Sequence, residues 1–194
     1  MSLDSTELLM SLEDYLHISI PDLEAEKIVT IQDMVDKAAA YKGIAEKSSV
    51  LQARLAQRVN TALTELQLIS EPFAPGDRVF TVLNPFQGPN WLQFCEILNL
   101  EVPKPEIKDP PKAGLFKALR GIIWRVSYDW QAITLDQFLT VIAAANCEKL
   151  IDREAIRDHF ELYCVILAVV VEKTGVDFYE VRPEKSFAND LGID

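Results

Sequence analysis

The chain has 194 residues, of which 49% are hydrophobic and 25% are charged, and this composition excludes a disordered protein. Its longest apolar run, residues 162–171, is shorter than the about 18 residues that a membrane-spanning helix needs, and its three cysteines are too few and too widely spaced for a disulfide scaffold. No basic segment followed by an apolar stretch opens the sequence, so we expect no secretory signal and a cytoplasmic protein.

The net charge of -11 lies at the two ends of the chain. Residues 1–36 carry a charge of -8 and residues 172–194 carry -3, whereas residues 37–171 are neutral. Because nucleic acids and anionic lipids attract basic surfaces, the acidic ends indicate basic protein partners and no nucleic acid. The alternative, that these acids only keep the ends soluble, stays open at this point.

In chain order, the first expected element is an amphipathic helix over residues 2–16, because leucines recur there at spacings of three and four. A loop over 17–22 and a turn over 23–27 then lead to a second helix over 30–41. Thr30 can cap this helix through its hydroxyl, with Asp33 three residues later. The inward face of the second helix is expected to hold Ile31, Met34, Val35 and Ala38.

The next part of the chain alternates helical patterns with segments rich in proline. Apolar residues at helical spacing predict helices over 48–69 and 91–100. Between them, the short apolar run at 78–83 is bounded by glycines and prolines, which favours a strand or an extended segment. Four prolines within 102–114 exclude a helix interior and indicate a linker.

Three more helices are expected before the end of the chain. The first two cover 115–130 and 134–150, the second of them capped by Thr134 with Gln137 three residues on. The third opens at Asp152 or a neighbour and ends near Gly175, because glycine is the usual residue after a helix. The remaining residues to 194 are expected to form a loop.

Residues 2–36, which begin S-L-D-S-T-E-L-L-M-S-L-E-D-Y-L, closely resemble the second half of an acyl carrier protein without a gap. Residues 169–194, which end E-K-S-F-A-N-D-L-G-I-D, resemble the first half of the same family. The two halves stand in reversed order, and joining Asp194 to Ser2 restores the D-S-L motif in which that family carries 4'-phosphopantetheine on serine. The chain thus resembles a circularly permuted acyl carrier protein that encloses an inserted module.

The resemblance implies a mainly α fold in which the two chain ends form an acyl-carrier-like four-helix bundle. Residues 1–42 would supply its second half and residues 161–194 its first half. Residues 43–160 would be an inserted, mostly helical module of unknown role with at most a short strand. Neither half alone is large enough to bury an apolar core, whereas the two together are. The halves could also pair between two chains and give a swapped dimer.

The resemblance also implies a site. A phosphopantetheinyl transferase would attach 4'-phosphopantetheine, the covalent cofactor, to Ser2, which Asp194 and Leu3 would flank. Backbone N–H groups and the helix dipole at the start of the first helix would stabilise its phosphodiester. The residues expected to dock on basic surfaces of fatty-acid or polyketide-type enzymes are Glu7, Met10, Glu13, Asp14, Ile20 and Asp22. The residues expected to line an acyl pocket are Leu8, Leu12, Leu16, Ile28, Val35 and Phe187.

Each of these residues also has a simpler interpretation. Ser2 could be only a helix cap, the acids could form a solvated face, and the apolar residues would be core in any helical bundle. The chain departs from the family because its D-S-L motif is split across the two termini, and because Tyr15 and His17 stand where acidic or small residues are usual. The predicted function is a carrier protein, and the alternative is an unmodified interaction scaffold whose inserted module binds a partner protein.

The middle of the chain carries a weaker resemblance to the C-terminal part of some sulfotransferases. It covers G-D-R-V-F-T-V-L at residues 76–83 and N-W-L-Q-F-C-E-I-L-N-L-E-V-P at residues 90–103. No glycine-rich phosphate loop precedes these segments, so we do not expect that activity. No nucleophile, base or metal-ligand cluster emerges elsewhere, and we expect neither an enzyme nor a metal site.

Overall fold

The computed structural model describes residues 5–86, 88–105 and 132–193, and this part of the chain is mainly helical and contains no strand. The prediction of a mainly α fold is therefore confirmed, whereas the helix predicted over 115–130 lies outside the described residues. The elements are α1 (Ser5–Leu16), α2 (Asp22–Ala25), α3 (Ile31–Lys42), α4 (Val50–Glu65), the 3-10 turn η1 (Val79–Thr81), α5 (Asn90–Leu98), α7 (Leu135–Ala145), α8 (Cys147–Leu150), the 3-10 turn η3 (Arg153–Ala155), α9 (His159–Thr174) and α10 (Phe187–Leu191).

Local side-chain chemistry sets several helix ends where the sequence predicts them. The Thr30 hydroxyl accepts the backbone N–H of Asp33 at 3.1 Å, and the Asp33 carboxylate accepts the backbone N–H of Thr30 at 2.8 Å, so both members of the predicted cap are used. Thr134 and Gln137 form the same reciprocal cap on α7. α9 ends at Gly175, which has the left-handed backbone (φ +72°) that glycine adopts without strain.

The start of α9 and the character of the tail differ from the prediction. α9 begins at His159 instead of near Asp152, because Asp158 caps it by accepting the backbone N–H of Glu161 at 2.9 Å. Asp152 caps only η3, accepting the backbone N–H of Glu154 at 3.1 Å. The tail, predicted as loop, contains the short helix α10.

Two helices of the middle region, residues 43–160, are also shorter than predicted. The helix expected over 134–150 is divided at Asn146 into α7 and α8. The helix expected over 48–69 ends at Glu65. The apolar run at 78–83 forms η1, and its extended character is limited to one isolated bridge between Arg78 and Thr134.

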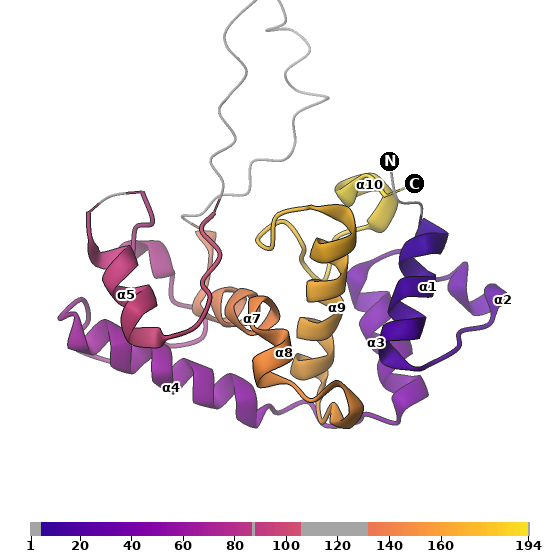
Figure 1. Ribbon diagram of the computed structural model, residues 1–194, viewed down its shortest axis with the longest axis horizontal. Helices are drawn as coiled ribbons and strands as arrows, with labels where there is room; N and C mark the ends of the chain where they lie inside the picture. The colour runs from indigo at the N-terminus through magenta and orange to yellow at the C-terminus, as the bar shows by residue number, and fades with distance from the viewer. Residues whose placement is uncertain (1–4, 87, 106–131, 194) are drawn as a thin grey trace, which may run out of the picture.

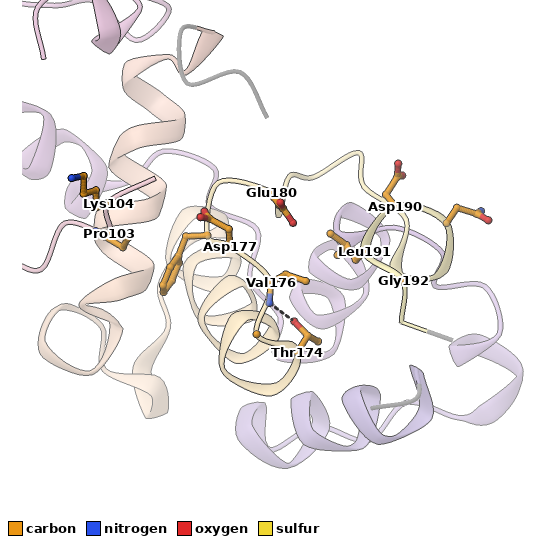
Figure 2. A pocket seen from close by; sticks show the side chains of 12 residues that line it. Pro103, Lys104, Thr174, Val176, Asp177, Glu180, Asp190, Leu191 and Gly192 are labelled. Carbon is orange, nitrogen blue, oxygen red and sulfur yellow. Dashed lines mark hydrogen bonds between the residues drawn. The ribbon is translucent and has the colours of Figure 1, made fainter. Parts of the chain in front are cut away.

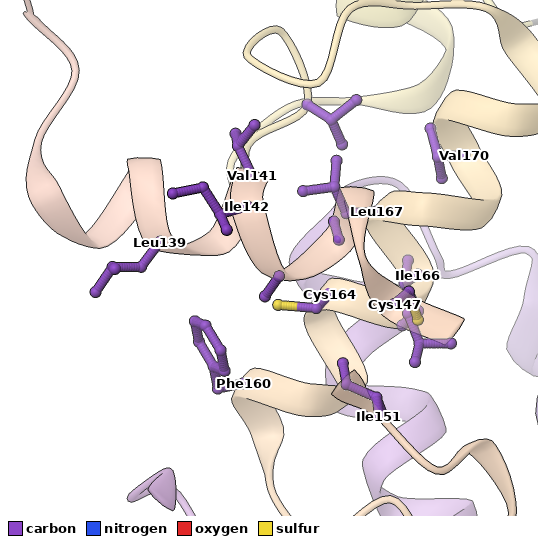
Figure 3. Packing of buried hydrophobic residues seen from close by; sticks show 14 of the residues in the cluster. Leu139, Val141, Ile142, Cys147, Ile151, Phe160, Cys164, Ile166, Leu167 and Val170 are labelled. Carbon is purple, nitrogen blue, oxygen red and sulfur yellow. The ribbon is translucent and has the colours of Figure 1, made fainter. Parts of the chain in front are cut away.

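α9 lies at the centre of the described structure (Figure 1). It packs against α1 and α3 on one side and against α7 and α8 on the other, while α4 packs against α7 and α5. A helix that is apolar all round is a buried helix, and α9 has this character. Figure 3 shows buried side chains where α7 and α9 pack together, among them Ile142 of α7 and Leu167 of α9. The fully buried apolar side chains of α9 include Leu162, Cys164, Val165, Ile166 and Val170.

The two ends of the chain fold against each other. Thr30 and Ser186 form an antiparallel bridge, and the backbone N–H of Ile31 donates to the carbonyl of Lys185 at 3.0 Å. The backbone N–H of Phe187 donates in turn to the carbonyl of Val29 at 3.1 Å. Together with the packing of α9 on α1 and α3, these bonds place the start of α1 and the end of α10 on the same side of the molecule (Figure 1).

Candidate functional site

The predicted attachment motif, Ser2, Leu3 and Asp194, lies outside the described residues. The chain next to it is well fixed, because Ser186 caps α10 by accepting the backbone N–H of Asn189 at 3.2 Å. Gly192 then reverses the chain with a left-handed backbone (φ +69°), and the backbone N–H of Ile193 donates to the carbonyl of Phe187 at 3.0 Å. Ile193 is buried, so the last described residue is anchored in the core.

Most residues of the predicted docking surface are on the outside of α1 and α2. Glu7, Met10, Asp14 and Asp22 are exposed, and Met10 retains 59% of its accessible surface. An exposed methionine among carboxylates combines an apolar contact with negative charge, as a surface for basic partners requires.

Glu13 and Ile20 do not fit that prediction. Ile20 is buried at 5% exposure, so its side chain is part of the core and not of the docking surface. Glu13 is half-buried, and its carboxylate accepts the backbone N–H of Ile20. The chain turns inward after α1 at His17, which has a left-handed backbone (φ +52°), and Glu13 holds this turn in place.

An apolar cleft of about 610 Å³ lies between α1, α2, α3 and α10. Its lining includes four of the six residues predicted for an acyl pocket, Leu8, Leu12, Ile28 and Phe187. The other two, Leu16 and Val35, are buried in the core but do not line the cleft. The residues that the prediction did not place there are Thr6, Leu9, Asp22, Ala25, Glu26 and Met34.

Two of the missed lining residues carried a signal in the sequence. Leu9 belongs to the leucine repeat of α1, and Met34 was predicted for the inward face of α3. Asp22 and Glu26 are the charged residues of the lining, both exposed, and no basic side chain lines the cleft. An anionic group bound in the cleft would be a buried charge without a basic partner, so the cleft suits a neutral apolar group better.

Glu24 fixes one wall of this cleft by tying α2 to α3. Its carboxylate accepts hydrogen bonds from Lys37 at 3.0 Å and from the Tyr41 hydroxyl at 3.1 Å. The hydrogen bonds from Lys37 and Tyr41 lower the pKa of Glu24 below its ordinary value. Sequence spacing does not predict this clamp, because α2 and α3 meet only in the folded chain.

A second cleft, of about 640 Å³, lies between the middle region and the tail (Figure 2). Its walls are the loop at Pro103 and Lys104, the residues that follow α9, and α10. Figure 2 shows Lys104 pointing away from the other lining residues, and its ammonium lies 5.7 Å from the centre of the Phe86 ring. The lining carboxylates of Asp177, Glu180 and Asp190 make this cleft acidic, which disfavours the binding of an acyl chain.

Two of the three cysteines, Cys147 and Cys164, are buried. Cys164 is fully buried, and burial raises its pKa well above the ordinary value. Burial likewise raises the pKa of Cys147 to about 11, so neither thiol is ionised near neutral pH. Within the described ranges, no three His, Cys, Asp or Glu side chains are grouped as metal ligands would be.

No family model and no solved structure matches the chain. Among the helices that the structure describes, none combines the length and apolar character that crossing a membrane requires. The chemistry of the site follows from its residues, from the cleft that they form and from the pairing of the two chain ends.

Proposed function

We propose that this protein is a carrier protein that holds a 4'-phosphopantetheine arm on Ser2 and docks on basic surfaces of fatty-acid or polyketide-type enzymes. In this proposal α9, α1, α2 and α3 are the four helices of an acyl-carrier-like bundle in permuted order. Residues 43–160 are the module inserted between its two halves. The acyl-chain chemistry belongs to the partner enzymes, and this chain is not itself an enzyme.

The observation that carries the proposal is the origin of the apolar cleft. Leu8, Leu12 and Ile28 come from the beginning of the chain and Phe187 from its end, yet they line one cavity of about 610 Å³. The backbone bonds between residues 29–32 and 183–187 hold these two segments together. A permuted carrier requires both features, since its acyl pocket is built from two segments that are distant in the sequence.

The exposed residues of α1 support the docking role. Glu7 and Asp14 lie on the outer side of α1 with Met10 between them in sequence, and Asp22 follows at the start of α2. Negative charge of this kind steers a partner with a basic patch towards the helix and increases the rate of association. Ser2 stands three residues before the first residue of α1 in the sequence, and the positive end of a helix dipole favours a phosphodiester near it.

Attachment of the arm is the direct test. The full chain is incubated with a phosphopantetheinyl transferase and coenzyme A, and its intact mass is measured. We expect one added phosphopantetheine group, which Ser2→Ala abolishes and Ser5→Ala retains. The Ser5→Ala variant is the matched control, because it removes a serine three positions from Ser2 in the sequence. No added mass, or an added mass that survives Ser2→Ala, would refute the proposal.

The unmodified scaffold is the second candidate, and one observation favours it. α9 packs on the end helices and on α7 and α8 alike, so the middle region shares a core with the proposed bundle. A scaffold that presents two surfaces in a fixed relation needs such a shared core. If the wild-type chain accepts no arm and still binds a partner protein through residues 43–160, the scaffold is the better assignment.

A further inference from the structure

Large apolar side chains are exposed next to the apolar cleft between α1, α2, α3 and α10. Leu23 directly follows Asp22 of the lining and retains 75% of its accessible surface. Val29 directly follows Ile28 of the lining and retains 53%. Exposed apolar surface that is rimmed by polar residues is typical of a site that binds another protein.

The rim of this cleft is negatively charged. Asp22 and Glu26 are its charged lining residues, and among the described residues neither carboxylate has a hydrogen-bond or ion-pair partner. Residues 1–36, which form most of the cleft, contain nine acids and only one base, Lys27. Unpaired carboxylates beside apolar surface favour an occupant that carries both basic and apolar side chains.

The chain itself contains a segment of this composition. Residues 110–128 are the longest stretch of the sequence without an acidic residue, and they hold four basic ones in a protein whose net charge is -11. They lie outside the described residues. The basic and apolar residues that are interspersed in this segment include Lys112, Leu115, Phe116, Lys117, Leu119, Arg120, Ile122, Trp124 and Arg125.

The positions at which the described chain meets this segment favour a second copy as its source. The described chain ends before the segment at Pro105 and resumes after it at Ala132. Both residues belong to the middle region, whereas the cleft belongs to the end helices (Figure 1). A segment held at both ends by the middle region can enter the cleft of a neighbouring copy without passing around its own α9, which lies between α7 and the pair α1 and α3.

We propose that two copies of this chain associate, with the apolar side chains of residues 110–128 of each copy in the apolar cleft of the other and the basic side chains on Asp22 and Glu26. The two contacts are equivalent, so the association closes as a dimer with two-fold symmetry. The bundle halves stay paired within each chain through the backbone bonds between residues 29–32 and 183–187, so no halves are exchanged. In the carrier assignment the segment and an acyl group compete for the cleft, but the dimer itself requires no arm on Ser2.

Sedimentation equilibrium of the full, unmodified chain over a range of concentrations measures this association. We expect the mean mass to rise from 21.9 kDa towards twice that value. The dissociation constant should increase with ionic strength, because salt screens contacts between exposed charges.

Charge reversal tests whether these two surfaces meet. One variant combines Lys117→Glu with Arg120→Glu, and the other combines Asp22→Lys with Glu26→Lys, so like charges face each other in either variant alone. Each variant should associate with itself about tenfold or more weakly than the wild-type chain. An equimolar mixture of the two should recover the dimer, because opposite charges then face each other in both contacts.

Lys47→Glu with Arg54→Glu is the matched control, because it reverses two exposed charges of the middle region outside residues 110–128 and should leave the affinity unchanged. If Asp22→Lys with Glu26→Lys does not fold, as judged by circular dichroism, Asp22→Asn with Glu26→Gln replaces it and should also weaken the association.

Four outcomes overturn the inference. The first is the mass of a single chain at every concentration, which a segment docked in its own copy would also give. The second is a dimer that neither reversal weakens, as an exchange of bundle halves would give. The others are an equal loss in the control and a mixture that stays monomeric although both variants fold.

Discussion

At the scale of single residues, Asn146 illustrates what the sequence cannot reveal. Its buried side chain donates to the carbonyls of Glu101, at 2.8 Å, and Ile142, at 2.8 Å, and accepts the backbone N–H of Glu101 at 3.0 Å. Nothing in the sequence distinguishes it from the other residues of the predicted helix over 134–150. Its role depends on a loop 45 residues away, and that contact divides α7 from α8.

Replacing Asn146 with Ala should destabilise the fold by about 1–3 kcal/mol, because the backbone N–H and carbonyl of Glu101 would lose their partner and the buried Asn146 side chain would no longer join the loop to α7. The free energy of unfolding is measured by urea titration. Asn189→Ala, an exposed change in α10, is the control and should alter stability by no more than about 0.5 kcal/mol. Equal effects of the two changes would show that the Asn146 side chain bonds do not hold the loop.

At the scale of elements, the sequence predicts best what short-range chemistry decides. The caps at Thr30 and Thr134 follow from a hydroxyl and an acceptor three residues later, and both are confirmed. Asp152 and Asp158 offer the same local signal, so the sequence could not tell which of them opens α9. α10 has five residues, too few for a repeating apolar pattern, and it forms because the chain end packs on the other elements.

The cap of α3 should make stability depend on acid pH. Hydrogen bonds from the backbone N–H of Thr30, and from Val29, lower the pKa of Asp33 below 3.8 in the folded chain. A carboxylate whose pKa is lower in the folded than in the unfolded chain stabilises the fold at every pH above its unfolded pKa. This contribution is lost as the pH falls through 3.8 and below. Asp33→Asn should therefore reduce stability at neutral pH and make unfolding less sensitive to acid.

Urea unfolding of the wild-type chain and Asp33→Asn at several pH values measures this effect. At neutral pH we expect a loss of about 1 kcal/mol, the usual contribution of a capping side chain. Asp36→Asn is the matched control, since Asp36 is an exposed residue of the same helix and outside the cap. An unchanged slope of stability against pH in Asp33→Asn would contradict the assignment.

At the scale of the whole molecule, the sequence indicated which segments meet but not how the middle region packs. Complementary motifs at the two ends predicted that they associate, and four of the six pocket residues line one cleft. Ile20 was misplaced because exposure depends on the turn after α1, which the Glu13 carboxylate sets. α7 and α8 pack on the second side of α9. The sequence indicates this packing only through the apolar side chains all round α9.

Because α9 packs on both parts, the described chain should unfold in one transition. Leu167→Ala, a change at a buried position that faces α7, should lower stability by about 2–5 kcal/mol. The loss should be the same by tryptophan fluorescence, which reports on the middle region that contains all three tryptophans, and by circular dichroism, which reports on every helix. Leu92→Ala, exposed at 68% on α5, is the control and should change stability little. Two separate transitions, with only one of them displaced by Leu167→Ala, would mean that the end helices and the middle region fold independently. The scaffold alternative would then lose the shared core that favours it.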